Sequence, residues 1–180
     1  SNGFNKISTG VVTLACLLIF LVFSSLVLPD QAAKAESYAG EAGSPDTSLF
    51  YTSKDLYRFA EAYGEEGRTA YIRARFTFDV IWPITYLIFL VTSISWLLRK
   101  ANLHNSRWGL LNLVPVFGTA FDFIENSMAS IVMARYPQTT IVIDRLAGVF
   151  TLLKWVFISG SFVVLIASVL LMLFRLKKRK

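Results

Sequence analysis

The stretch from Trp108 to Ala134 is mostly apolar and long enough to cross a bilayer, yet it contains two carboxylates one helical turn apart. Steps of three and four residues place a set of small and polar residues on one broad helical face: Gly118, Asp122, Glu125, Asn126 and Ser130. An ionisable group at that depth costs about 3 kcal/mol or more, so it normally faces a protein interior or a water-filled cavity. The sequence therefore predicts a buried polar site within a membrane protein.

Hydrophobic residues make up 54% of the 180 residues and are gathered into blocks, as is typical of polytopic membrane proteins. A spanning helix needs about 20 apolar residues. The segments that qualify cover residues 11–28, 76–98, 108–134 and 146–174. We therefore expect an all-α integral membrane protein, a four-transmembrane-helix bundle in which residues 1–180 form a single membrane domain.

The net charge of +6 is distributed unevenly along the chain. Residues 99–107 and 175–180 contain basic residues and no acid, whereas residues 30–75 are mildly acidic. By the positive-inside rule, both termini and the 99–107 connection are cytoplasmic, with residues 30–75 and 136–145 outside. This pattern favours a plasma-membrane protein whose basic tail meets anionic lipid headgroups, and it argues against a nucleic-acid partner.

Residues 29–75 are predicted to form an extracytoplasmic linker followed by a short amphipathic helix. Residues 29–46 are rich in Ala, Gly, Ser and charge and lack periodicity, which favours an exposed, mobile linker. Thr52 or Ser53 then caps a helix, whose apolar stripe contains Leu56, Phe59, Ala60 and Tyr63. This helix either lies on the outer surface as a cap of the bundle or serves as a lid over an outward-facing cavity.

The first apolar segment has two interpretations. Lys6 precedes it, and Ala33-Lys34-Ala35 resembles a signal-peptidase site, as in a cleaved signal peptide. The apolar run is nevertheless longer than the usual signal core of about 7–15 residues. We therefore expect an uncleaved signal-anchor helix.

Depth in the membrane predicts one specific ion pair. With a rise of 1.5 Å per residue, Glu125 lies about 13 Å and Lys154 about 12 Å below the outer ends of their consecutive helices. Asp122 lies one turn deeper, and Asp79 lies one turn into the second span. Glu125 and Lys154 are therefore expected to pair, which leaves a surplus carboxylate that is protonated or neutralised by a cation.

These residues form the predicted site. Asp122 and Glu125 are the candidate acid–base or ligand-binding groups, because a carboxyl group poised in this way can exchange protons. Asp79, Asn126 and Lys154 are the candidate ligand-binding residues. The alternative is that Asp122, Glu125, Asn126 and Lys154 only join helices to one another, and that Asp79 is solvated near the interface.

The sequence indicates neither a cofactor nor a metal. His104 is the only histidine and lies in the predicted cytoplasmic loop, and no phosphate loop, nucleophile elbow or dinucleotide fingerprint is present. The only cysteine, Cys16, excludes an intramolecular disulfide.

The leading interpretation is an intramembrane pocket, facing the outer leaflet, that binds or acts on a lipid-like hydrophobic molecule. The alternatives are a small oligomeric proton- or ion-coupled transporter and a non-catalytic partner subunit of a larger membrane complex.

The layout also resembles the four-helix sterol isomerase and sigma-2 receptor group, whose members enclose acidic residues in an apolar cavity. The matching features are Asp79 before Trp82-Pro83, and Asp122 with Glu125. The resemblance concerns architecture and transfers neither residue roles nor activity.

Overall fold

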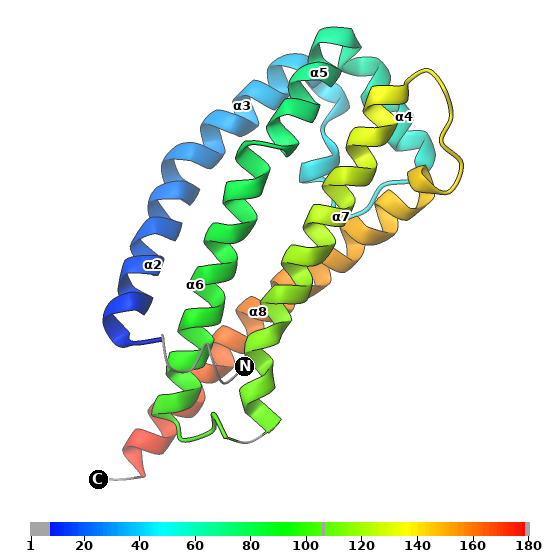
Figure 1. The fold of residues 1–180 in the computed structure, drawn as a ribbon. Helices are drawn as coiled ribbons and strands as arrows, with labels where there is room; N and C mark the ends of the chain where they lie inside the picture. The colour runs from blue at the N-terminus through cyan, green and yellow to red at the C-terminus, as the bar shows by residue number, and fades with distance from the viewer. Residues whose placement is uncertain (1–7, 106, 179–180) are drawn as a thin grey trace.

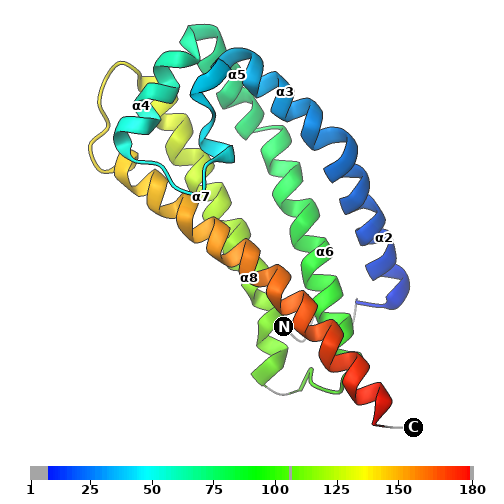
Figure 2. The same cartoon turned by 180° about the vertical axis from the view of Figure 1, so that it is seen from behind.

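The computed structural model describes residues 8–105 and 107–178, and this part of the chain is helical without strands. Figures 1 and 2 show long helices lying side by side, with the chain reversing direction between them. The cap end of the molecule holds α4, α5 and the 136–142 loop. The tail end holds the start of α2, the connection after α6 and the end of α8.

The first long helix combines α2 (Gly10–Val22), the π-helical turn η1 (Phe23–Val27) and α3 (Leu28–Ala39). The prediction of a mobile linker from residue 29 is therefore wrong for residues 29–39. Ala, Lys and Glu dominate residues 32–36 and are strong helix formers. The wide turn before Pro29 accommodates the proline, which has no N–H to donate to the preceding turn.

The cap end consists of short elements: η2 (Gly40–Ala42), η3 (Pro45–Thr47), α4 (Ser53–Ala62) and α5 (Gly64–Arg75). Thr52 caps α4 as predicted, in a capping box with Asp55. The hydrogen bonds from Thr52 hold the pKa of the Asp55 carboxyl below its usual value. Helix α4 contacts α7 and α8 and buries Leu56, Phe59 and Ala60.

The remaining elements are α6 (Phe78–Lys100), the 3-10 segment η4 (Arg107–Leu113), α7 (Val114–Arg135) and α8 (Ile143–Lys177). Residues 108–113, predicted as the start of the third span, are 3-10 rather than α-helical. Pro115 lies in the first turn of α7, where its missing N–H is tolerated, and does not kink the middle of a helix.

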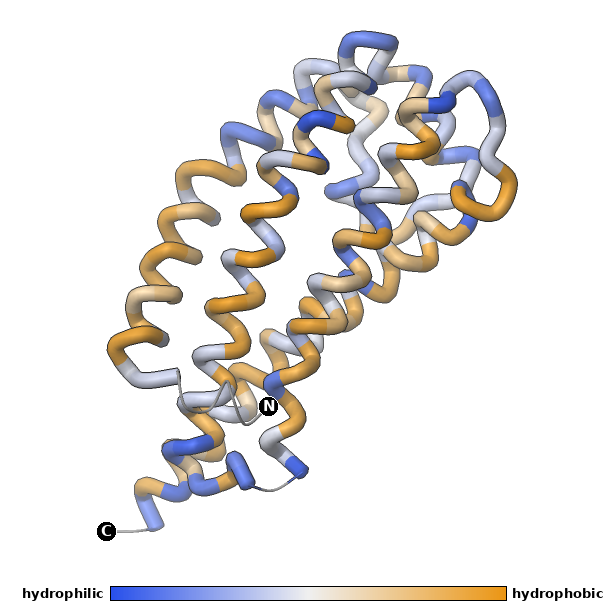
Figure 3. The backbone as a smooth tube through the Cα atoms, viewed as in Figure 1, coloured by the Kyte–Doolittle hydropathy of each residue, from blue (hydrophilic) through white to orange (hydrophobic). Residues whose placement is uncertain are grey.

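Three helices are long and apolar enough to cross a membrane, at Gly10–Ala39, Gly64–Lys100 and Ile143–Lys177. Helix α7, which carries Asp122, Glu125 and Asn126, is not among them. Figure 3 shows hydrophobic segments along the long helices and hydrophilic residues gathered towards both ends. These features support membrane association of an all-α chain with three candidate spans.

Two clusters of buried apolar residues lie along the long helices. The cluster towards the cap end includes Tyr71, Met133 and Ala147, and the other, towards the tail end, includes Tyr86 and Leu98. On α8, Lys154 lies between the two clusters, because Ala147 belongs to the first and Ile158 packs against the second.

Candidate functional site

The ammonium group of Lys154 in α8 contacts both predicted carboxylates of α7. Its Nζ donates to Glu125 Oε2 at 2.9 Å and lies 3.3 Å from Asp122 Oδ1. The exposed fractions are 0% for Glu125, 5% for Lys154 and 7% for Asp122. The Glu125–Lys154 pair predicted from depth is therefore confirmed, and the structure adds Asp122 as a second partner of the lysine.

The predicted face of α7 is packed closely against α8. A side-chain Cβ at Gly118 would lie 3.1 Å from the side chain of Ile158, so only glycine leaves the helices this close without a shift. This approach lets the Lys154 ammonium reach across to both acids.

Two tyrosine hydroxyl groups complete the hydrogen bonding of the acids. Tyr86 of α6 donates to Asp122 Oδ2 at 2.8 Å, and Tyr51 donates to Glu125 Oε1 at 2.7 Å. Asn126 Nδ2 also donates to Asp122 Oδ1, at 3.3 Å. Burial, reinforced by the Glu125 carboxylate, raises the pKa of Tyr51, so this hydroxyl stays protonated and continues to donate.

Sequence reasoning missed both tyrosines as site residues. Tyr86 carries a usable signal, because it lies about two helical turns after Asp79 and so shares its face. Tyr51 lies between η3 and α4, where no periodicity indicates which way a side chain points.

The segment comprising residues 44–52 crosses over the site at its cap-end side. Asp46 in this segment pairs with Arg75, and the Ser48 carbonyl accepts from Trp155 Nε1 at 3.0 Å. The Tyr51 carbonyl lies against Gly148 of α8, where an added Cβ would overlap it. Gly148 therefore allows the Tyr51 backbone to approach α8 closely enough for the hydroxyl to reach Glu125.

Asp79 belongs to a neighbouring cluster centred on Arg75. The guanidinium lies 2.8 Å from Asp79 and 4.4 Å from the centre of the Tyr71 ring. Among the described residues, Asp79 forms its ion pair with Arg75 and forms none with Lys154. The structure thus brings together four of the five predicted site residues and places Asp79 beside them.

Negative charge is in surplus across the two clusters. The four carboxyl groups are those of Asp46, Asp79, Asp122 and Glu125, and the two cations are Arg75 and Lys154. Buried carboxylates without enough cations take up a proton or meet a positively charged group. This arrangement can exchange a proton with a bound molecule.

Several buried polar atoms beside the acids have no hydrogen-bond partner within the described residues. On α7 these are Asn126 Oδ1 and Ser130 Oγ. On α5, which packs against α7, the Tyr71 hydroxyl is in the same situation. Buried polar atoms are nearly always hydrogen-bonded, so a group of unpartnered ones is suited to a water molecule or to a polar group of a ligand.

In the part of the chain that the structure describes, no group of three or more His, Cys, Asp or Glu side chains is arranged to hold a metal ion. The chain matches no family model, no curated protein and no solved structure.

We predict that Lys154→Met lowers stability by about 3–5 kcal/mol, because it leaves two buried carboxylates without their cation. Glu125→Gln costs less, since Asp122 still pairs with the lysine, and the double variant recovers part of the loss. Thermal unfolding in detergent measures the coupling. Lys100→Met at the exposed end of α6 is the control, and strictly additive losses would contradict the pairing.

A second prediction concerns Gly148. Gly148→Ala should displace the Tyr51 backbone, break the Tyr51–Glu125 hydrogen bond and lower the melting temperature in detergent. Gly160→Ala in the same helix is the matched control, because a Cβ there meets no atom within 4 Å and alanine favours the helix. Equal melting temperatures for the two variants would contradict the prediction that Gly148 is needed for the close approach of the Tyr51 backbone.

Proposed function

We propose that the chain binds a lipid-like molecule whose polar headgroup lies beside Asp122, Glu125 and Lys154. The observation that carries this proposal is the pair of unpartnered buried polar atoms on α7, at Asn126 and Ser130. They lie on the face that also carries the acids. A hydroxyl or carbonyl headgroup would complete their hydrogen bonds, whereas an apolar molecule would leave them unsatisfied.

Asp122 and Glu125 are the proton-exchanging groups of the proposed site. Lys154 and the two tyrosine hydroxyls hold both acids in fixed positions. The surplus of carboxylates supports a proton shared between the acids and the headgroup. The unpartnered side-chain carbonyl oxygen of Asn126 orients the bound group. Asp79 adds a further carboxyl group beside the site.

The site is proposed to lie in the outer half of the membrane. In this topology α7 is a span in addition to the three candidate spans and the third of four in chain order. The pairing of its charges with α6 and α8 makes it tolerable in the bilayer. Both termini and the tail end are cytoplasmic, the membrane is the plasma membrane, and α4 is the amphipathic helix of the first extracytoplasmic loop. The basic residues at the tail end support this orientation.

Single-cysteine labelling tests the topology. In a Cys16→Ser background, Leu49→Cys should react with a membrane-impermeant maleimide added outside, and Asn105→Cys only after the inner side is exposed. Both positions are exposed in the structure, so a lack of reaction on the expected side reflects orientation and not burial. The reverse labelling pattern would overturn the topology.

Native mass spectrometry tests the ligand. The wild-type protein purified in mild detergent should retain a lipid-like molecule, and the double variant Asn126→Ala/Ser130→Ala should retain it about tenfold less, because two hydrogen bonds are lost. Ser127→Ala is the matched control, since this exposed hydroxyl bonds only to its own helix at Phe123.

Two results would contradict the proposal. Wild-type protein free of any retained molecule, or equal retention by all variants, would leave the unpartnered atoms without a ligand. Proton flux in liposomes would then favour the transporter alternative, and co-purification with a larger complex would favour the partner subunit.

A further inference from the structure

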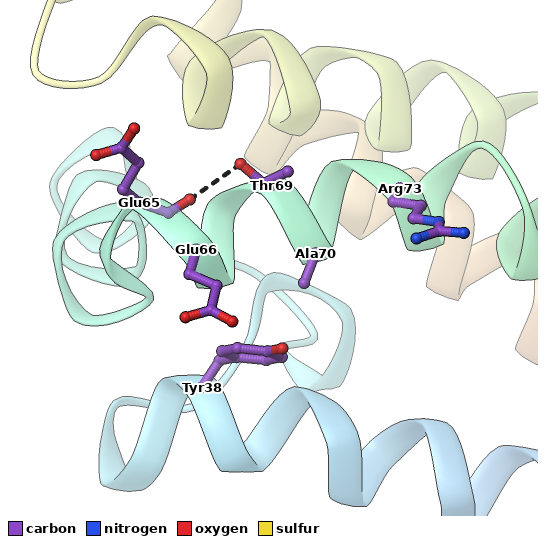
Figure 4. A pocket seen from close by; sticks show the side chains of 6 residues that line it. All are labelled: Tyr38, Glu65, Glu66, Thr69, Ala70 and Arg73. Carbon is purple, nitrogen blue, oxygen red and sulfur yellow. Dashed lines mark hydrogen bonds between the residues drawn. The ribbon is translucent and has the colours of Figure 1, made fainter.

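A hollow of about 540 Å³ opens at the cap end between α3 and α5, apart from the ion-pair site. Figure 4 shows Glu66 and Ala70 of α5 pointing towards Tyr38 of α3, with Arg73 farther along α5 and Glu65 pointing away from the ring. The lining residues are Tyr38, Glu65, Glu66, Thr69, Ala70 and Arg73. We call this hollow the α3–α5 groove.

Close packing fixes the aromatic wall of the α3–α5 groove. A Cβ at Gly67 would lie 3.0 Å from the Cβ of Tyr38, so the glycine allows α3 to approach α5 at this point. The Tyr38 ring remains 38% exposed and lies beside Glu66 and Ala70. The ring is thus held at the groove and presents a surface to whatever occupies it.

The groove contains charges of both signs that have no partner. Among the described residues, Glu65, Glu66 and Arg73 form no ion pair, although all three are long enough to do so. Unpaired exposed charges are usually just solvated. Here, however, two acids, one guanidinium and an aromatic ring line one hollow, which is a more specific arrangement than a solvated surface requires.

The positive and negative groups of the groove are separated along α5. Arg73 lies at the end of α5 that continues into the apolar helix α6, followed by Phe76, which is 61% exposed. Glu65 and Glu66 lie about 10–12 Å farther from α6, from the rise of 1.5 Å per residue. The positive group is therefore nearer the hydrocarbon and the negative groups are farther from it.

We propose that the α3–α5 groove binds the headgroup of a zwitterionic glycerophospholipid. In such a lipid the phosphate is nearer the acyl chains than the terminal ammonium, which matches the order of charges on α5. Arg73 bonds the phosphate through its planar guanidinium. Glu66 and the Tyr38 ring hold the ammonium. This site is separate from the one at Asp122, so either can fail alone.

The test is lipid competition read by native mass spectrometry. The full chain is transferred to detergent micelles containing equal amounts of phosphatidylcholine and phosphatidylglycerol, and the ratio of the two bound lipids is measured. The wild-type protein should retain more phosphatidylcholine. Glu66→Gln should lower the ratio about fivefold, the effect of losing one charge contact near a membrane surface.

Matched variants separate the groove from general charge effects. Glu61→Gln removes an exposed carboxylate of α4 outside the groove and should leave the lipid ratio unchanged. Tyr38→Phe should keep the preference because it keeps the ring, whereas Tyr38→Leu should lose it. Arg73→Gln should reduce retention of both lipids, and Arg58→Gln, also exposed but on α4, should not.

Three outcomes would overturn the proposal. The first is a wild-type preference for phosphatidylglycerol or no preference at all. The second is an equal effect of Glu66→Gln and Glu61→Gln, and the third is an equal effect of Tyr38→Phe and Tyr38→Leu. The variant Ser127→Ala, at an exposed hydroxyl outside both sites, should change the lipid ratio in none of these experiments.

Discussion

The contact of Lys154 with Asp122 and Glu125 is the interaction on which the rest of the structure depends. Helix α7 carries two acids and an amide in its middle and is therefore a poor membrane helix by itself. Burying these acids costs free energy. The lysine from α8 and the tyrosine from α6 offset this cost only when all three helices are packed together. The polar site thus determines which helices must be neighbours, as well as being the candidate binding site.

The periodic parts of the sequence predict the fold well, and its irregular parts do not. Apolar runs locate the long helices because bilayer thickness sets a minimum length. Composition alone, however, does not separate a polar linker from a polar helix that continues a span, and residues 29–39 prove to be helical. Apolar content places the start of α7 too early, because it does not distinguish the 3-10 segment η4 from an α-helix. Pro115 marks the correct start, since proline is favoured in the first turn of a helix.

The same limit applies to the site. Depth along a helix follows from a fixed rise per residue, so the Glu125–Lys154 pair could be predicted without knowing helix rotation. The sequence groups Asp79 with Asp122 and Glu125. Arg75 lies one turn before Asp79, however, and forms the ion pair with it. Tyr51 and Asp46 lie in a segment without periodicity, where only three-dimensional packing shows that their side chains reach Glu125 and Arg75.

The segment comprising residues 44–52 bears on the kind of molecule that the site can admit. It contacts Arg75, Trp155 and Glu125 at once, so a route through the cap end would break three polar contacts together. Each of these contacts costs free energy to lose, and breaking them would expose buried charge. A molecule that approaches from the hydrocarbon, between the helices, leaves this segment in place. For the proposed site, this difference supports a ligand that partitions into the bilayer over a substrate that arrives from water.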